Sequence, residues 1–130
     1  MTEFRVGAIL RDDIPTLSAE TPIRRAVAVL VDAGAAAAPV LSEDGQLIGI
    51  LTQKDCFTPA LHASYHREWT GQVGDYMSRE VITVDVDDEV IRVAEMFIQH
   101  RHRVFPVLNA TSVVGVLHRS DVLALLMRIG

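Results

Sequence analysis

The chain has 130 residues, of which 49% are hydrophobic and 22% charged, so it can bury the core of an ordinary globular domain without a disulfide or a metal. Its 17 acidic residues outnumber its 12 basic ones, and this formal charge of −5 argues against wrapping nucleic acid or lying on an anionic membrane. The single cysteine, Cys56, excludes an internal disulfide and a cysteine-based zinc cage, and no apolar run approaches the roughly 20 residues of a membrane helix. We therefore expect a cytoplasmic protein that binds neither nucleic acid nor membrane.

The chain begins with a pattern typical of a strand followed by a helix. Apolar residues at Ile14–Leu17 predict a short strand. Thr21 then offers an N-cap, with Pro22 at the first helical position. An apolar stripe at helical spacing follows and predicts a helix that ends near Gly34.

A β-hairpin and a second helix are expected next. The apolar runs Ala37–Leu41 and Leu47–Leu51 flank a polar turn in which Gly45 would take a positive φ. Thr52 and Asp55 then have the spacing of a capping box, with a hydroxyl at the N-cap and an acid three residues later. This spacing predicts that a helix begins directly after the second strand.

A proline interrupts this second helix. Because a proline in a helix interior costs about 3 kcal/mol, we expect one turn and then a new start, capped by Thr58 with Pro59 at its first position. The connector that follows, Ala60–Trp69, is expected to be helical.

The second half of the chain repeats this order. Its expected strands are Val81–Val84, Val104–Leu108 and Val113–Leu117, and its expected helices are Asp87–Gln99 and Arg119–Arg128.

The repetition is also visible residue by residue. Val6-Gly7 recurs as Val73-Gly74 and Pro39-Val40-Leu41 as Pro106-Val107-Leu108, both at the same offset along the chain. Gly49 and Asp55 recur as Gly115 and Asp121 at a slightly shorter offset, because the hairpin turn of the second copy is shorter. Such a register over both halves indicates an internal repeat. We divide the chain into one repeat at residues 1–58, a connector at 59–69 and a second repeat at 70–130.

The repeated motif resembles a known family. It comprises Ala38-Pro39-Val40-Leu41 with Ile48-Gly49-Ile50-Leu51-Thr52-Gln53-Lys54-Asp55, and Phe105-Pro106-Val107-Leu108 with Val114-Gly115-Val116-Leu117-His118-Arg119-Ser120-Asp121. The doubled pattern is similar to a tandem of cystathionine β-synthase-type (CBS) domains, called a Bateman module. The resemblance implies a mixed α/β fold in which two βαββα repeats pack about a pseudo-two-fold axis. It further implies two clefts that in many members bind AMP, ADP, ATP, S-adenosylmethionine or similar adenosine-type ligands, and a homodimer.

The resemblance assigns roles to residues at the start of each closing helix. In the family, an acid three residues after a Thr/Ser position accepts hydrogen bonds from both ribose hydroxyls, while the hydroxyl and the helix N–H groups face the phosphate. Asp55 and Thr52 hold these positions in the first repeat. In the second repeat they are held by Asp121, Ser120 and His118, where His118 replaces the usual Thr or Ser.

A basic pair distinguishes the two implied clefts. His102-Arg103 resembles the phosphate-contacting pair in γ-subunits of AMP-activated kinase, whereas the first repeat has Ala35-Ala36 at these positions. Arginine offers a planar fork suited to phosphate oxygens. We therefore expect the Asp121 cleft to be the better site for a phosphorylated nucleotide. The resemblance to the family implies that the adenine of this nucleotide lies against Ile14 and Pro15.

The Asp55 cleft, which Val81 would help to line, is expected to take a less charged adenosyl ligand or to stay empty. The residues by themselves also allow simpler interpretations: Thr52 and Asp55 as a helix cap only, His102-Arg103 as a solvated cation pair, and Cys56 as a buried small hydrophobe. No arrangement of residues indicates a metal site or a catalytic nucleophile with its base.

We therefore predict a stand-alone regulatory module, not an enzyme, that binds an adenosine-type nucleotide and signals in trans to an effector protein. The alternative is a structural homodimerisation or interaction module whose clefts are degenerate and do not bind. Asp55 and Asp121 discriminate between the two, according to whether they are open to a ligand or held by protein donors.

Overall fold

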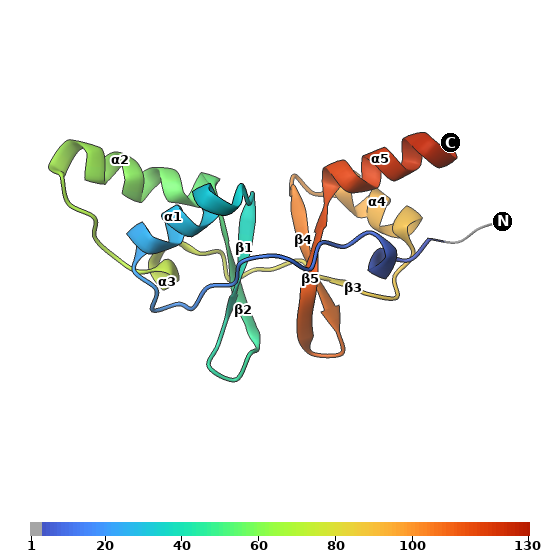
Figure 1. Cartoon of the computed structure of the whole chain (residues 1–130), viewed down its shortest axis with the longest axis horizontal. Helices are drawn as coiled ribbons and strands as arrows, with labels where there is room; N and C mark the ends of the chain where they lie inside the picture. Colours follow the sequence, from blue (N-terminus) through green and yellow to red (C-terminus); the bar gives the residue numbers. More distant parts are fainter. Residues whose placement is uncertain (1–3) are drawn as a thin grey trace. The chain divides into compact units, whose positions relative to one another are not determined.

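The computed structural model describes residues 4–130, and two compact units can be distinguished within them (Figure 1). We call residues 14–81 the central unit and residues 4–13 with 82–130 the terminal unit. Each unit combines most of one sequence repeat with a short segment of the other. Backbone hydrogen bonds of 2.9 Å hold these segments in place, from Val73 to Thr21 in the central unit and from Gly7 to Val86 in the terminal unit.

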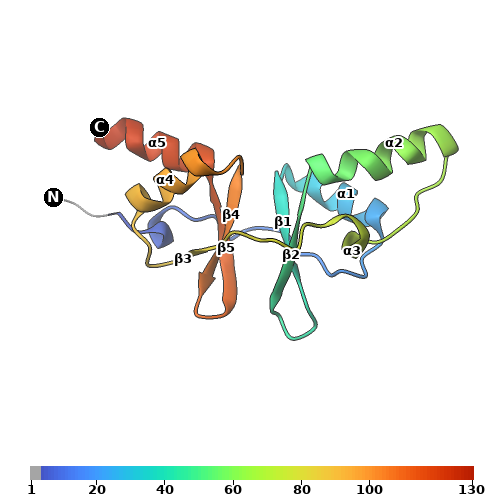
Figure 2. The same ribbon diagram turned by 180° about the vertical axis from the view of Figure 1, so that it is seen from behind.

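The central unit packs two long helices beside a β-hairpin. The two helices, α1 and α2, lie side by side (Figures 1 and 2). The hairpin strands pair antiparallel, and Gly45 has a φ of +80° in their turn. In chain order the elements are α1 (Ile23–Ala33), β1 (Ala37–Leu41), β2 (Leu47–Thr52), the 3-10 turn η2 (Lys54–Cys56), α2 (Phe57–His66) and α3 (Val73–Tyr76).

The terminal unit repeats this plan with one more strand. Its sheet has the order β3-β4-β5, in which β3 runs parallel to β4 and β4 antiparallel to β5. The helices α4 and α5 contact each other. In chain order the elements are the 3-10 turn η1 (Val6–Ala8), β3 (Val84–Asp85), α4 (Val90–Gln99), β4 (Val104–Asn109), β5 (Ser112–His118) and α5 (Arg119–Ile129).

Each unit has its own hydrophobic core. In the central unit, Ile23 and Leu30 of α1 pack with Leu51 of the hairpin, and all three are at most 1% exposed. In the terminal unit, Phe105 of β4 is fully buried and stacks on Phe97 of α4, with ring centroids 4.3 Å apart. The apolar stripes of the sequence therefore face these cores, and the predicted mixed α/β fold class is confirmed.

Two predictions for the start of the central unit were wrong. No strand forms at Ile14–Leu17, where only Leu17 makes a bridge, to Val40. Thr21 does not cap α1 either, since the N-cap is Pro22 and the Thr21 hydroxyl pairs with Ser18 instead. The first N–H of α1 donates to the Gly71 carbonyl at 3.1 Å, so a distant backbone group replaces a side-chain cap.

The proline in α2 lies inside the first helical turn, but not where we expected it. The N-cap of α2 is Cys56, not Thr58, so Pro59 is the third helical residue. This costs no hydrogen bond, because the first N–H groups of a helix have no partner within it. The helix also ends at His66 instead of continuing to residue 69, because Arg67 takes the left-handed conformation with φ 55°.

In the second half, the hairpin strands and α5 are confirmed, whereas the first strand and α4 are displaced. The strand is Val84–Asp85 instead of Val81–Val84, and the helix begins at Val90 instead of Asp87. The carboxylate of Asp88 accepts a hydrogen bond from the Asp85 N–H, at 2.8 Å. Such a local side-chain bond to the backbone favours a turn over a helix start.

Candidate functional site

In each unit, the candidate site begins at the first turn after the hairpin. In the central unit, the Thr52 hydroxyl accepts a hydrogen bond from the Asp55 N–H at 3.1 Å, and the Asp55 Oδ2 accepts one from the Thr52 N–H at 3.0 Å. The two reciprocal hydrogen bonds of the predicted capping box are therefore confirmed, but the N-cap of η2 is Gln53 instead of Thr52. The second carboxylate oxygen of Asp55 has no protein hydrogen bond among the described residues, so it can accept one from a ligand.

Asp121 has a different environment in the terminal unit. It lies in the first turn of α5, and both of its carboxylate oxygens accept hydrogen bonds from Arg11, at 2.7 Å from Nε and 2.9 Å from Nη2. The Arg11 hydrogen bond holds the pKa of Asp121 below its usual value, while burial opposes this change. Sequence reasoning missed Arg11, because 110 residues separate the partners and only the tertiary fold brings them together.

His118 adjoins this ion pair. It is the N-cap of α5, and its side chain makes no capping hydrogen bond. Burial lowers the pKa of His118, the charge of Arg11 lowers it further, and Asp121 partly offsets both effects. His118 is therefore predominantly neutral at pH 7. Ser120, the second helical residue, is exposed to solvent.

His102 and Arg103 immediately precede β4 in the terminal unit. The His102 ring packs against Phe105, with a centroid distance of 5.7 Å, and its buried Nδ1 has no hydrogen-bond partner within the described residues. Arg103 is exposed, and its carbonyl accepts a hydrogen bond from the Arg119 N–H at 2.8 Å. Its backbone therefore lies next to the first turn of α5.

The ten predicted site residues are divided evenly between the units. Five lie in the terminal unit: His102, Arg103, His118, Ser120 and Asp121. The other five lie in the central unit: Ile14, Pro15, Thr52, Asp55 and Val81. Ile14, Pro15 and Val81 are half-buried.

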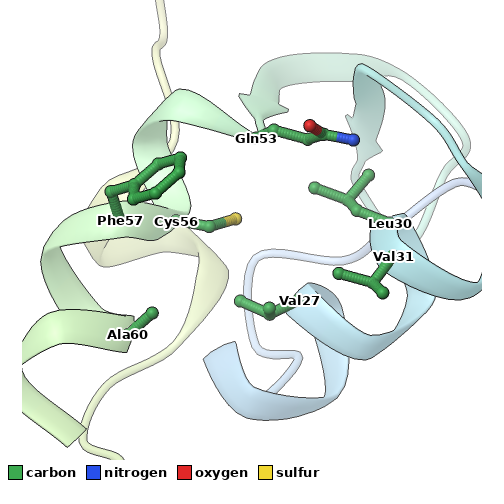
Figure 3. A pocket seen from close by; sticks show the side chains of 7 residues that line it. All are labelled: Val27, Leu30, Val31, Gln53, Cys56, Phe57 and Ala60. Carbon is green, nitrogen blue, oxygen red and sulfur yellow. The ribbon is translucent and has the colours of Figure 1, made fainter. Parts of the chain in front are cut away.

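An apolar pocket between α1 and α2 was not predicted from the sequence. Its volume is about 290 Å³, and Figure 3 shows its side chains. Gln53 supplies its polar edge and donates from Nε2 to the Ala35 carbonyl at 2.8 Å. The lining residues are Val27, Leu30, Val31, Gln53, Cys56, Phe57 and Ala60.

Cys56 is buried at this pocket, which agrees with its interpretation as a small hydrophobe. Its Sγ lies 3.3 Å from the Thr52 carbonyl, and burial raises the pKa of the thiol to about 11. The thiolate needed for nucleophilic chemistry is therefore scarce at neutral pH.

Two further features of residues 4–130 bear on other functions. None of the helices described there is long and apolar enough to cross a membrane. Within the same residues, no group of three or more His, Cys, Asp or Glu side chains lies close enough together to hold a metal ion.

Comparison with known proteins gives relatives over nearly the whole chain. A protein of Methanocaldococcus jannaschii described as uncharacterized, MJ1225, is 25% identical over 121 residues, which cover 93% of this chain. The chain spans only 42% of the length of MJ1225.

Solved structures share the fold. The CBS domain pair of protein MJ0100, in complex with 5′-methylthioadenosine and S-adenosyl-L-methionine, superposes with a TM-score of 0.83 at 25% identity, covering 99% of this chain and 100% of that one. CBSX2 in complex with AMP superposes with a TM-score of 0.82 at 20% identity, covering 97% of this chain and 98% of that one. The model of the CBS domain matches this sequence twice, at residues 6–59 and 73–128. The chain therefore belongs to the CBS domain family and contains two copies of this domain.

Proposed function

We propose that this chain is a regulatory module of the cytoplasm that binds an adenosine-type nucleotide and passes the signal in trans to an effector protein, without catalysis of its own. The observation that carries the proposal is the carboxylate in the first turn after each hairpin. Asp55 in the central unit keeps one oxygen open to a ligand, whereas Asp121 in the terminal unit is held by Arg11, which a ligand would have to displace. A carboxylate can accept hydrogen bonds from both hydroxyls of a ribose. The adenosyl ligands of the MJ0100 pair support this class of ligand.

The two carboxylates suit different ligands. Arg11 is bonded to Asp121, and the backbone of Arg103 lies next to the helical turn of Asp121, so we assign the phosphorylated nucleotide to this site. Asp55 has a capping threonine and no bonded cation among the described residues, so we assign a less charged adenosyl ligand to it. His102, His118 and Ser120 complete the proposed Asp121 site within the terminal unit.

Thermal unfolding of the chain with AMP, ADP, ATP and S-adenosylmethionine tests this proposal, with GMP as the control ligand. A ligand at about 100 times its dissociation constant adds about 2.7 kcal/mol, which raises the Tm of a chain of this size by several degrees. The shift from AMP should disappear in Asp121→Ala and persist in Asp44→Ala, which removes an exposed acid from the hairpin turn. An unchanged Tm with every adenine ligand would contradict nucleotide binding.

A second function, homodimerisation, is favoured by the exposed apolar side chains of the helices. In the central unit Tyr65 of α2 is 82% exposed, and in the terminal unit Ile98 of α4 and Met127 of α5 are 86% and 79% exposed. Large apolar side chains exposed in this way mark surfaces for protein contact. We propose that a second copy of the chain covers these helices.

Sedimentation velocity tests the dimer directly. Met127→Glu should shift the wild-type dimer towards monomer, because it would bury an unpaired charge in the contact. Thr111→Glu, which adds the same charge at an exposed position in the turn between β4 and β5, serves as the control. A wild-type protein that sediments as a monomer at all concentrations would contradict this second function.

A further inference from the structure

The two oxygens of Asp121 that a ribose would need are already occupied. The Arg11 guanidinium binds both in a bidentate ion pair, at 2.7 and 2.9 Å. The two side chains are 52% and 31% exposed, so solvent and a ligand can reach the pair. Each oxygen keeps a further lone pair, but a ribose that binds both oxygens in the bidentate position must displace Arg11.

The backbone of Arg11 is held against β5. Its N–H and carbonyl pair with the Val116 carbonyl and N–H, at 2.8 and 2.9 Å. Gly115 permits this approach, because a Cβ at that position would collide with the Arg11 carbonyl. Only the side chain of Arg11 can therefore leave the carboxylate, and its guanidinium stays tethered beside the first turn of α5.

The central unit provides an internal comparison. Ser78 pairs with Ile50 of β2 through the same two backbone hydrogen bonds, both 2.9 Å. Ser78 also follows Arg11 at the offset by which Val73 follows Val6, so the two positions correspond in the two repeats. One backbone position thus carries an arginine next to Asp121 in one unit and a serine in the other.

Among the described residues, no other charged group near the first turn of α5 replaces Arg11 as the partner of Asp121. His118 faces the pair but is predominantly neutral at pH 7, since burial and Arg11 both lower its pKa. Ser120 is uncharged, and Arg103 and Arg119 are exposed and make no side-chain bond to Asp121 among the described residues. Arg11 is therefore the cation that a ligand releases when it takes Asp121.

We propose that Arg11 determines the ligand selectivity of the Asp121 site by requiring a phosphate. A phosphorylated nucleotide supplies a new bidentate partner for the released guanidinium, while its ribose takes the freed carboxylate. A nucleoside takes the carboxylate and leaves Arg11 without a partner. This inference rests on the proposed nucleotide binding, which it deepens.

The test is isothermal titration of the full chain with AMP and with adenosine, which share the base and ribose and differ in the phosphate. Asp55→Asn serves as the background, so that only the Asp121 site is measured. Arg11→Ser, which copies Ser78, should lower the preference for AMP over adenosine by about tenfold, because a charge-assisted hydrogen bond to the phosphate is lost and no ion pair opposes adenosine. Arg92→Ser is the matched control, since the exposed side chain of this α4 arginine makes no hydrogen bond or ion pair within residues 4–130.

The possible outcomes distinguish a failure of the role proposed for Arg11 from a failure of the proposed function. If the Asp55→Asn background binds AMP and Arg11→Ser keeps the same preference as this background, the role of Arg11 is overturned and nucleotide binding stands. If wild type binds neither AMP nor adenosine, the inference is overturned. The proposed function is overturned with it only if ADP, ATP and S-adenosylmethionine also leave the Tm unchanged. If wild type binds AMP and the Asp55→Asn background does not, the Asp121 site is not the nucleotide site and the inference is overturned. Arg11→Lys, which keeps the charge but loses the fork, should retain more of the preference than Arg11→Ser, and the reverse order would also overturn the role of Arg11.

Discussion

Breaking the ion pair between Arg11 and Asp121 should cost a small and measurable amount of stability. The pair is bidentate, but its side chains are 52% and 31% exposed. Exposed ion pairs contribute about 0.2–1 kcal/mol in double-mutant cycles. Bidentate arginine–carboxylate pairs belong to the upper part of this range, so we expect a coupling energy of about 0.5–1 kcal/mol between Arg11→Ala and Asp121→Ala.

The contribution of Asp121 should also depend on pH in a defined direction. The Arg11 hydrogen bond lowers the pKa of Asp121 in the folded chain, whereas an unfolded aspartate has a pKa of about 3.9. As the pH falls, the unfolded chain takes up the proton first. The contribution is therefore complete above about pH 5 and is lost as the pH falls towards the folded pKa.

Urea unfolding measures this effect, because urea is uncharged and does not screen the pair. The free energy of unfolding of the wild type should exceed that of Asp121→Asn at pH 7, and the difference should shrink towards pH 3. It should also shrink at about 1 M salt, where the Debye length is about 3 Å. Glu95→Gln, which changes an exposed acid of the same unit, controls for the loss of one negative charge.

Two results would refute this reasoning. One is a coupling energy of zero at low salt and pH 7, which would mean that the pair adds nothing to folding. The other is a parallel loss of stability by wild type and Asp121→Asn from pH 7 to pH 3, which would mean that the carboxylate has the same pKa in the folded and unfolded chains.

Three further experiments probe the two units separately. Phe105→Ala should cost about 3–5 kcal/mol in urea unfolding, because it empties a fully buried site in the core of the terminal unit; a loss below about 1 kcal/mol would contradict that packing. Asp55→Ala should cost about 1 kcal/mol by removing the acceptor of the Thr52 N–H, whereas Asp44→Ala in the exposed turn should cost less than about 0.5 kcal/mol. Cys56 should react with iodoacetamide much more slowly than free cysteine at pH 8, because its pKa is raised to about 11 and its side chain is buried; equal rates would refute this.

The elements could be predicted from local patterns wherever those patterns decide the structure. The hairpin strands follow from their apolar runs, the turn from Gly45, and the capping box from the spacing of Thr52 and Asp55. The predictions failed where a distant segment replaced a local signal. Thr21 has a side chain suited to an N-cap. The first N–H of α1 nevertheless donates to the carbonyl of Gly71, which is far along the chain.

At the candidate site, too, local patterns predicted one feature of the two carboxylates and distant contacts set another. Both could be predicted from the sequence, since they occupy corresponding positions after the hairpins of the two repeats. Their different hydrogen-bond partners could not be predicted in this way. Asp55 is bonded to a residue three positions away, whereas Asp121 is bonded to Arg11 from the opposite end of the chain.

The repeat, the mixed α/β class and the positions of the two carboxylates could be predicted from local patterns, because periodicity, turn residues and capping act within a few residues of one another. The packing of residues 4–13 with residues 82–130, which brings Arg11 to Asp121, is visible in the folded chain alone. Packing of this kind depends on contacts between residues far apart in the chain, and no local pattern records which of them will meet.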